Sequence, residues 1–313
     1  MIKKTAILVS LLLLLLLLNI IFCNGVPLFQ KSAWQTIFFQ FRLPRALTAF
    51  CAGGVLSIAG LLMQNIFKNP LAGPDILGIS QAASLAVAIS ILSNFAFGGI
   101  IIAAIIGSCC YLFLLILLSK HISNSTTLLL IGVMSGFLFS AIISTMQSFS
   151  AAENIKSYVM WGMGSFAKNT PNQAIIFLIV TPLLFLFAMF HAQKFDLLLL
   201  GNQKASMLGL NVSNIFIIAV LVAGVATGIS AAFCGPVAFV GLAAPHLCKM
   251  WFATYSHKWL ITACFFMGAS ITLFADLLAS SLVSDIQFPL NAMLSILAAP
   301  VILWVIIKRR NEN

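Results

Sequence analysis

Residues 99–119 read GIIIAAIIGSCCYLFLLILLS, a stretch without a single charged side chain. A run of about 20 apolar residues is long enough to cross the hydrocarbon core of a bilayer as an α-helix. Such a helix forms all of its backbone hydrogen bonds within its own segment, and this is required because lipid tails offer no hydrogen-bond partners. Similar runs recur along the chain, so this stretch indicates the architecture of the whole protein.

The composition supports a membrane protein. Hydrophobic residues make up 62% of the 313 positions and charged residues only 7%, whereas soluble domains are roughly half apolar and a quarter charged. A transmembrane barrel would instead show segments of roughly ten residues with alternating polarity, and that pattern is absent from the sequence. The predicted fold class is therefore all-α, with the chain crossing the lipid bilayer many times.

Ten apolar segments are predicted to form membrane helices in one domain spanning residues 1–313. They cover 5–23, 46–67, 76–94, 99–119, 126–150, 173–192, 213–234, 237–252, 259–282 and 291–307. The segment 237–252 is short and follows Gly235-Pro236, which predicts a half-helix or a bent segment surrounded by protein. The first segment is longer than a signal-peptide core and lacks a small-x-small cleavage site, which favours a retained helix.

The basic residues indicate the orientation. With the N-terminus placed in the cytoplasm, eleven Lys and Arg residues fall inside and five outside, in agreement with the positive-inside rule. This predicts a multi-pass inner-membrane protein with both termini in the cytoplasm. The net charge of +10 is thus a topology signal, and no nucleic-acid partner is expected.

Asp276 is predicted to lie within the ninth membrane segment. A carboxylate inside a membrane is a functional candidate, while the alternative is that it hydrogen-bonds a neighbouring helix. The structural alternative is favoured because no Lys or Arg lies nearby within a membrane segment. If Asp276 were instead used for ion coupling, the protein would be a secondary transporter or channel.

No metal site is predicted. The seven cysteines lie mostly in apolar stretches and form no Cys-x-x-Cys pair, so they are interpreted as packing residues. His246, beside Pro245, has no nearby carboxylate or cysteine in the sequence, and is interpreted as a structural hydrogen-bonding residue. His121, His191 and His257 lie at segment ends and are interpreted as topology or headgroup contacts.

Several short motifs follow one another in a fixed order. They are Arg42-Leu43-Pro44-Arg45, Gln64, Asn69-Pro70-Leu71-Ala72-Gly73-Pro74, Leu77-Gly78, Leu200-Gly201 with Ala205, Leu208-Gly209-Leu210-Asn211, Gly235 to Leu242, Pro245-His246, Ala275-Asp276 and Ala299-Pro300. Together, from about residue 35 to 310, they resemble the permease family of the iron-siderophore, haem and cobalamin ABC importers, the FecCD-like type II importers.

The resemblance implies a single transmembrane permease domain that works as one of a pair, most simply a homodimer in membrane lipid. Its expected partners are two cytoplasmic ATPase subunits and a periplasmic substrate-binding protein. The chain contains no Gly-x-x-x-x-Gly-Lys-Ser/Thr phosphate loop, so ATP is expected on the partner subunits and no cofactor in this chain. The chain is accordingly expected to be a transport subunit for an iron-chelate-type substrate, not an enzyme.

The resemblance also implies roles for individual residues at the outer face. Arg42 and Arg45 are expected to dock the binding protein, since Arg presents a fixed fork of donors to a carboxylate; the alternative is contact with lipid headgroups. A turn at Pro44 is expected to point both side chains away from the membrane. Many relatives carry a further arginine where this chain has Ser280-Ser281, so the docking surface is expected to be weaker or differently built.

At the inner face, residues 199–211, here called the coupling segment, resemble the element that contacts the ATPase. Its matching residues are Leu200, Gly201, Ala205, Leu208 and Gly209. A helix with permissive glycine ends is expected, and the alternative is an ordinary basic loop. Relatives usually have acidic residues after the first glycine, where this chain has Asn202, Gln203 and Lys204, so the complementary charge of the ATPase is expected to differ.

Two further segments carry expectations. Asn69 and Pro70 end the second apolar run, and the resemblance places them near a cytoplasmic gate; alone, the dipeptide would be only a turn. The connection 151–172 contains Tyr158, Trp161 and Phe166, which predicts a short interfacial helix with aromatics at headgroup level.

Overall fold

The computed structural model describes residues 2–22, 34–93, 98–121, 125–281 and 288–310. Within those residues the chain is helical and contains no strand. The elements are α1 (Ile2–Phe22), α2 (Trp34–Ile37), η3 (Phe38–Arg42), α3 (Leu43–Ile66), η4 (Pro74–Leu77), α4 (Ile79–Leu92), α5 (Ile100–His121), α6 (Ser125–Ser148), α7 (Ala152–Gly162), α8 (Pro171–Phe190), α9 (Ala192–Leu198), α10 (Asn202–Met207), α11 (Val212–Cys234), α12 (Val240–Phe252), α13 (His257–Ser281) and α14 (Leu290–Arg310).

The helices coincide with the ten predicted membrane segments. Among the described residues, seven helices are long and apolar enough to cross a membrane, and Ile79–Leu92 and Leu290–Pro300 are shorter apolar helices. The predicted half-helix is α12, whose 13 residues follow the non-helical segment 235–239. The all-α, multi-pass fold class is therefore confirmed.

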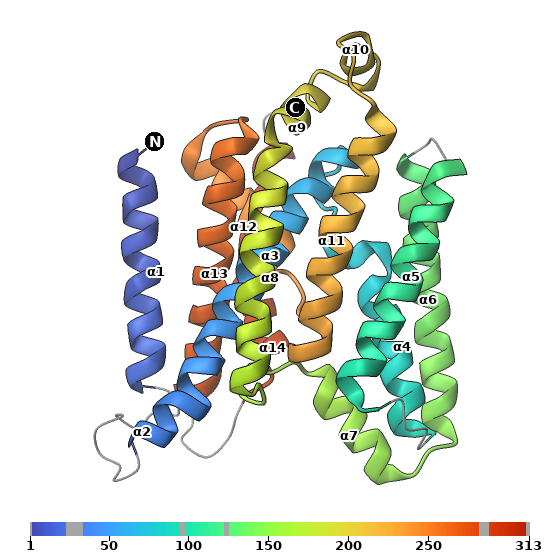
Figure 1. The fold of residues 1–313 in the computed structure, drawn as a ribbon, viewed down its shortest axis with the longest axis vertical. Coiled ribbons are helices and arrows are strands. Elements are labelled where there is room, and N and C mark those ends of the chain that lie inside the picture. Colours follow the sequence, from blue (N-terminus) through green and yellow to red (C-terminus); the bar gives the residue numbers. More distant parts are fainter. Residues whose placement is uncertain (1, 23–33, 94–97, 122–124, 282–287, 311–313) are drawn as a thin grey trace.

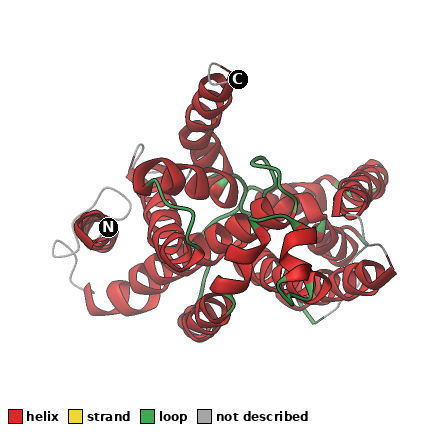
Figure 2. Cartoon of the chain, turned by 90° about the horizontal axis from the view of Figure 1, so that it is seen from above, coloured by secondary structure: helices red, strands yellow, loops and turns green. Residues whose placement is uncertain are grey.

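Most of the membrane helices stand side by side in a bundle, while α3 crosses it obliquely and α14 extends sideways from it (Figures 1 and 2). In Figure 1, α1 begins at the upper end of the bundle, and α9 and α10 lie at that same end. Helices α2 and α7 lie at the opposite, lower end. These two ends are called the α10 end and the α7 end below.

Helix α3 is the central helix of the bundle. In its most apolar part 89% of the residues are buried, against 22% in α6 and in α8. Close backbone contacts make this possible, since a Cβ at Gly53 would collide with the carbonyl of Gly268 and one at Gly60 with the carbonyl of Gly241. Small residues let membrane helices approach until their backbones touch, so α3 packs directly on α13 and α12.

Several local boundaries differ from the predictions. No turn interrupts the chain at Pro44, because helix runs without a break from Trp34 to Ile66 and Pro44 occupies its tolerated place in the first turn of α3. Helix α4 starts at Ile79, not at residue 76, after the left-handed Gly78. The helix expected in 151–172 is present as α7.

Candidate functional site

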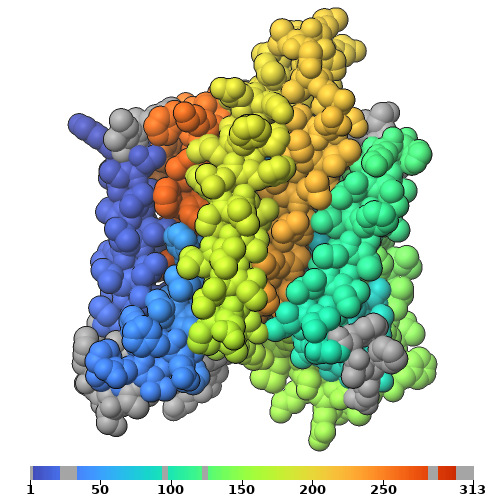
Figure 3. Space-filling model, viewed as in Figure 1, coloured from blue at the N-terminus to red at the C-terminus, as the bar shows by residue number. Residues whose placement is uncertain are grey.

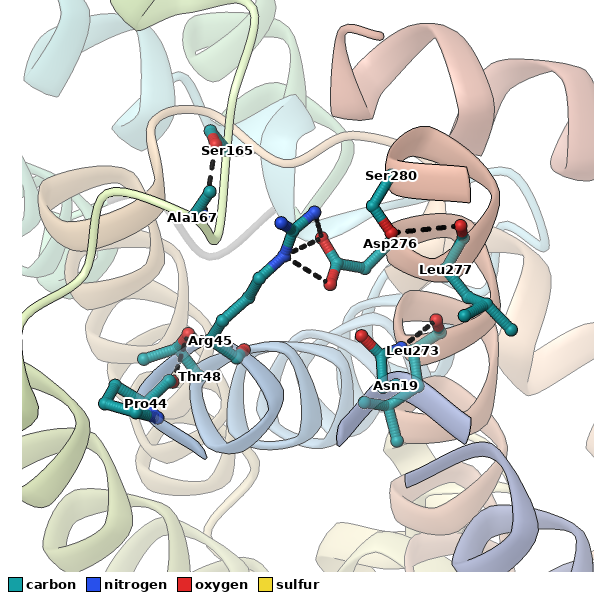
Figure 4. A network of polar contacts seen from close by, with 10 residues as sticks. All are labelled: Asn19, Pro44, Arg45, Thr48, Ser165, Ala167, Leu273, Asp276, Leu277 and Ser280. Atoms are coloured by element: carbon teal, nitrogen blue, oxygen red, sulfur yellow. Dashed lines mark hydrogen bonds and ion pairs between the residues drawn. The ribbon is translucent and has the colours of Figure 1, made fainter. Parts of the chain in front are cut away.

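Arg45 and Asp276 form a buried ion pair between α3 and α13 (Figure 4). Arg45 Nε lies 2.8 Å from Asp276 Oδ2, and Arg45 Nη2 lies 2.9 Å from Oδ1. The two residues are only 6% and 1% exposed. This pair agrees with the interpretation that Asp276 has a structural role, and its partner Arg45 lies 231 positions away in the sequence.

Arg42 lies one turn before Arg45 and is 5% exposed. Its Nη1 donates to the main-chain oxygens of Ile20 at 2.8 Å and Ile21 at 2.6 Å. These carbonyls belong to the last turn of α1, where the helix leaves acceptors without an internal partner. The expectation that both arginines point away from the membrane is therefore wrong: their donors hold α1 and α13 against the start of α3.

The coupling segment contains the expected helix. Gly201 and Gly209, with φ angles of 97° and 83°, flank α10 in the left-handed region, which L side chains rarely adopt. Ala205 is fully buried, whereas Met207 and Leu208 are 87% and 61% exposed. The segment projects from the α10 end (Figure 3), and exposed apolar side chains on such a projection are typical of a contact surface.

A polar cluster connects α9 to the body of the protein. Asp196 Oδ1 accepts from the backbone N–H of His257 and from its Nδ1, both at 2.7 Å. Asn65 Nδ2 also lies 2.8 Å from His257 Nε2 and donates to the Phe195 carbonyl at 3.1 Å. His257 is buried, and its interpretation as a topology or headgroup contact was wrong.

The environment of Asp196 changes its acidity. Burial works to raise the pKa of this carboxyl, but the hydrogen bonds and charge of His257 outweigh burial and hold the pKa below its ordinary value. The carboxylate form is thus favoured, and it links α9, which precedes the coupling segment, to α3 and α13. A cavity of about 220 Å³, lined by residues that include Asn65, Lys120 and Asn202, lies beside this cluster.

The turn after α3 is held by α12. His246 Nε2 donates to the Pro70 carbonyl at 2.7 Å, and Lys249 Nζ donates to Gln64 Oε1 at 3.0 Å. Asn69 Oδ1 accepts from the N–H of Leu71 at 2.9 Å, which closes the turn locally. The geometry brings together two motifs that lie far apart in sequence, and gives His246 the structural hydrogen bond expected of it.

The sequence reasoning missed one acidic residue. Asp75, in η4, lines a hollow together with Gly132 and Gly136 of α6, and it precedes the predicted segment 76–94 by one position. Its signal was available, because Asp75 is the acidic residue of the 69–78 motif. Within the described residues, no group of three or more His, Cys, Asp or Glu side chains could hold a metal ion.

Curated relatives resemble the chain over nearly its full length. It is 30% identical to the hemin transport system permease protein HmuU of Yersinia pestis, with 93% of this chain and 91% of that protein covered. It is 31% identical to the vitamin B12 import system permease protein BtuC of Klebsiella pneumoniae, with 96% and 93% covered.

The fold has a counterpart among solved structures, described as a metal-chelate type ABC transporter in an inward-facing conformation. That match has a TM-score of 0.87 and 29% identity, and covers 97% of this chain and 99% of the other. The family model for the FecCD transport family matches residues 5–308. The resemblance seen in the motifs is thereby confirmed, and the chain belongs to the FecCD transport family.

Proposed function

We propose that this chain is the membrane-spanning permease subunit of an ATP-binding-cassette importer. Its cargo is an intact iron-chelate-type substrate of the siderophore, haem or cobalamin class, carried from periplasm to cytoplasm. The observation that carries the proposal is the family match over residues 5–308, supported by relatives named for hemin and vitamin B12 transport. ATP hydrolysis belongs to a partner chain.

The coupling segment is the proposed contact with the ATPase pair. It offers the exposed side chains of Met207 and Leu208 on a projecting segment, with a glycine of positive φ at each end of α10. The link from Asp196 to His257 gives α9 a firm connection to α13. A push on α10 can therefore reach the membrane helices through hydrogen-bonded side chains as well as through the backbone.

The α10 end is proposed to face the cytoplasm and the α7 end the periplasm. Lys68, Lys120, Lys194, Lys204 and Lys258 all belong to connections or helix termini assigned to the inner side, which supports this placement. Asn69 and Pro70, hydrogen-bonded to α12 through the Pro70 carbonyl, are the proposed gate residues on that side. A second permease copy completes the passage.

The binding protein is proposed to dock on the α7 end. The docking role of Arg42 and Arg45 remains a prediction, and their donors already hold Ile20, Ile21 and Asp276 in the isolated subunit. Docking through these side chains would need an exchange of those contacts. Their positive charge at this end still favours an acidic partner surface.

A secondary transporter or channel driven by Asp276 is not supported. An ion-coupling carboxylate must be able to bind and release its ion, whereas Asp276 accepts three hydrogen-bond contacts from Arg45 and is 1% exposed. The Asp276 pair is accordingly assigned to helix packing.

The test is co-purification of the solubilised permease with its ATPase, followed by measurement of ATP hydrolysis. Gly201→Pro should release the ATPase, because proline cannot adopt the φ of 97° found there. Asn202→Ala, on the same segment but compatible with helix, is the matched control and should retain the partner. A permease that purifies alone and moves solute without ATP would overturn the proposal.

A further inference from the structure

A hollow lies between η4, α4 and α6, outside the contacts described so far. Its volume is about 300 Å³, and residues lining it include Asp75, Gln81, Gly132, Gly136 and Ser140. A second hollow of about 150 Å³ adjoins it and shares Asp75 and Gln81. The two polar side chains thus stand between two open spaces, here called together the Asp75 hollow.

The polar atoms at this place lack partners within the protein. Among the described residues, none makes a hydrogen bond or ion pair with the Asp75 carboxylate, and Gln81 Oε1 is buried without a hydrogen bond. Leaving a buried polar atom unsatisfied is costly, so proteins nearly always pair such atoms. The unsatisfied Gln81 oxygen, beside the half-buried Asp75 carboxylate, points to a donor that comes from outside the chain.

The hollow lies at the depth of the middle of the membrane-spanning helix α6. Gly132, Gly136 and Ser140 lie in the middle part of α6, which spans Ser125–Ser148. An ionisable side chain at this depth faces a water-filled or ligand-filled space when it has no cation beside it. Gly132 lets the α6 backbone touch Ile76 and Leu77, and Gly136, which contributes no side chain, leaves space beside Gln81.

We propose that the Asp75 hollow is a substrate-selecting subsite of the transport passage. Its two acceptors take N–H or O–H donors of the passing chelate, and its carboxylate favours cationic or neutral complexes over polyanionic ones. The inference rests on the proposed transport function, and it adds a charge preference that the permease itself imposes.

The first test measures the electrostatic preference without any transport substrate. Ser140→Cys is introduced into a chain whose Cys23, Cys109 and Cys110 are replaced by serine, and the detergent-solubilised protein is treated with two methanethiosulfonate reagents. One reagent carries a quaternary ammonium group and the other a sulfonate. A cleft lined by one sign of charge raises the local concentration of counter-ions by about tenfold or more, so the cationic reagent should react preferentially.

Two variants make this result specific. Ser206→Cys, on exposed α10, reports the intrinsic ratio of the two reagents, and the ratio at Ser140→Cys should exceed it by about tenfold. Adding Asp75→Asn should bring the Ser140→Cys ratio down to the control value, while Asp75→Glu should keep it. Equal ratios at both positions, or a ratio that Asp75→Asn leaves unchanged, would overturn the subsite.

The second test uses the complete importer in proteoliposomes. Ferric complexes of one chelator scaffold, differing only in a pendant ammonium or carboxylate group, are compared for KM and maximal rate. Asp75→Asn should lower the preference for the ammonium form by about tenfold, and Asp75→Glu should retain it. Unchanged selectivity in Asp75→Asn would overturn the subsite. A wild-type importer that moves none of the complexes would count against the transport function instead. The thiol measurement does not depend on transport, so the two failures can be told apart.

Discussion

Two regions of this protein place a carboxylate at membrane depth, and they treat it in opposite ways. At the α7 end of α3, Asp276 is enclosed by Arg45, and the two side chains share a bidentate contact. Beside α6, Asp75 faces an open hollow and accepts from none of the described residues. The difference shows that an acidic residue in a membrane segment is a functional candidate only after its neighbours have been counted.

The surroundings differ as much as the carboxylates do. Around Asp276, α3 and α13 touch backbone to backbone, and Asn19 donates to the Leu273 carbonyl at 2.7 Å. Around Asp75, α6 touches the η4 backbone at Gly132, but an open space of about 300 Å³ remains between η4, α4 and α6. The region around Asp276 is tightly packed, whereas the region around Asp75 keeps an open space that a ligand can enter.

The largest expected effect separates the two carboxylates directly. Asp276→Ala leaves the Arg45 guanidinium buried without its partner, and should cost about 3–5 kcal/mol in the free energy of unfolding. Asp75→Ala should change it by less than about 0.5 kcal/mol, since no described contact is lost. Denaturant titration in matched detergent micelles measures both values.

A double substitution provides the control for this comparison. Arg45→Met with Asp276→Leu replaces the pair by apolar groups and should recover most of the lost stability. Equal losses in the free energy of unfolding for Asp276→Ala and Asp75→Ala would contradict the contrast between a paired and an unpaired carboxylate.

A smaller effect is expected from the two amides of these regions. Asn19→Leu removes the second donor of the Leu273 carbonyl, which keeps its hydrogen bond within α13, and should cost about 0.5–1.5 kcal/mol. Gln81→Leu removes an oxygen that has no partner and should be neutral or stabilising by the same measurement. A clear loss of stability in Gln81→Leu would reveal an internal partner for that oxygen and weaken the contrast.

The smallest effect concerns a third carboxylate, Asp196, which is paired but partly exposed. Its pKa is lowered from 3.8, so its stabilising contribution is present above that pH and is lost as pH falls toward the folded-state pKa. The stability difference between the wild type and Asp196→Asn should therefore be steady from neutral pH down to about 5 and shrink below about 4. Unfolding midpoints measured across that range check the sign, and an equal difference at low and neutral pH would contradict it.

The sequence predicted the membrane segments well because each is a local property of about 20 neighbouring residues. The break at Gly235-Pro236 marked the start of the short α12, and Gly201 and Gly209 marked the ends of α10. The order of the motifs was sufficient to identify the family. These features all depend on residues close together in the chain.

The long-range polar contacts of the site could not be predicted from the local sequence. Arg45 and Asp276 are 231 positions apart, and Asp196 and His257 are 61 apart. Nothing local in either stretch specifies its partner. Asp75 was missed for a different reason, because the predicted membrane segment began at residue 76. In the structure the helix begins only at Ile79, and the short helical turn before it places Asp75 in the bundle.

Helix α3 has one further consequence for how the molecule works. Arg45 stands near one end of it, and Asn65, which contacts α9 and His257, stands at the other. Twenty residues of α-helix measure about 30 Å, so tilting such a rod by about five degrees about one end displaces the other by about 3 Å. A tilt that preserves most side-chain packing at Asn65 therefore shifts Arg45 by about one atomic diameter. Helices α1 and α13 are hydrogen-bonded to α3 at that end.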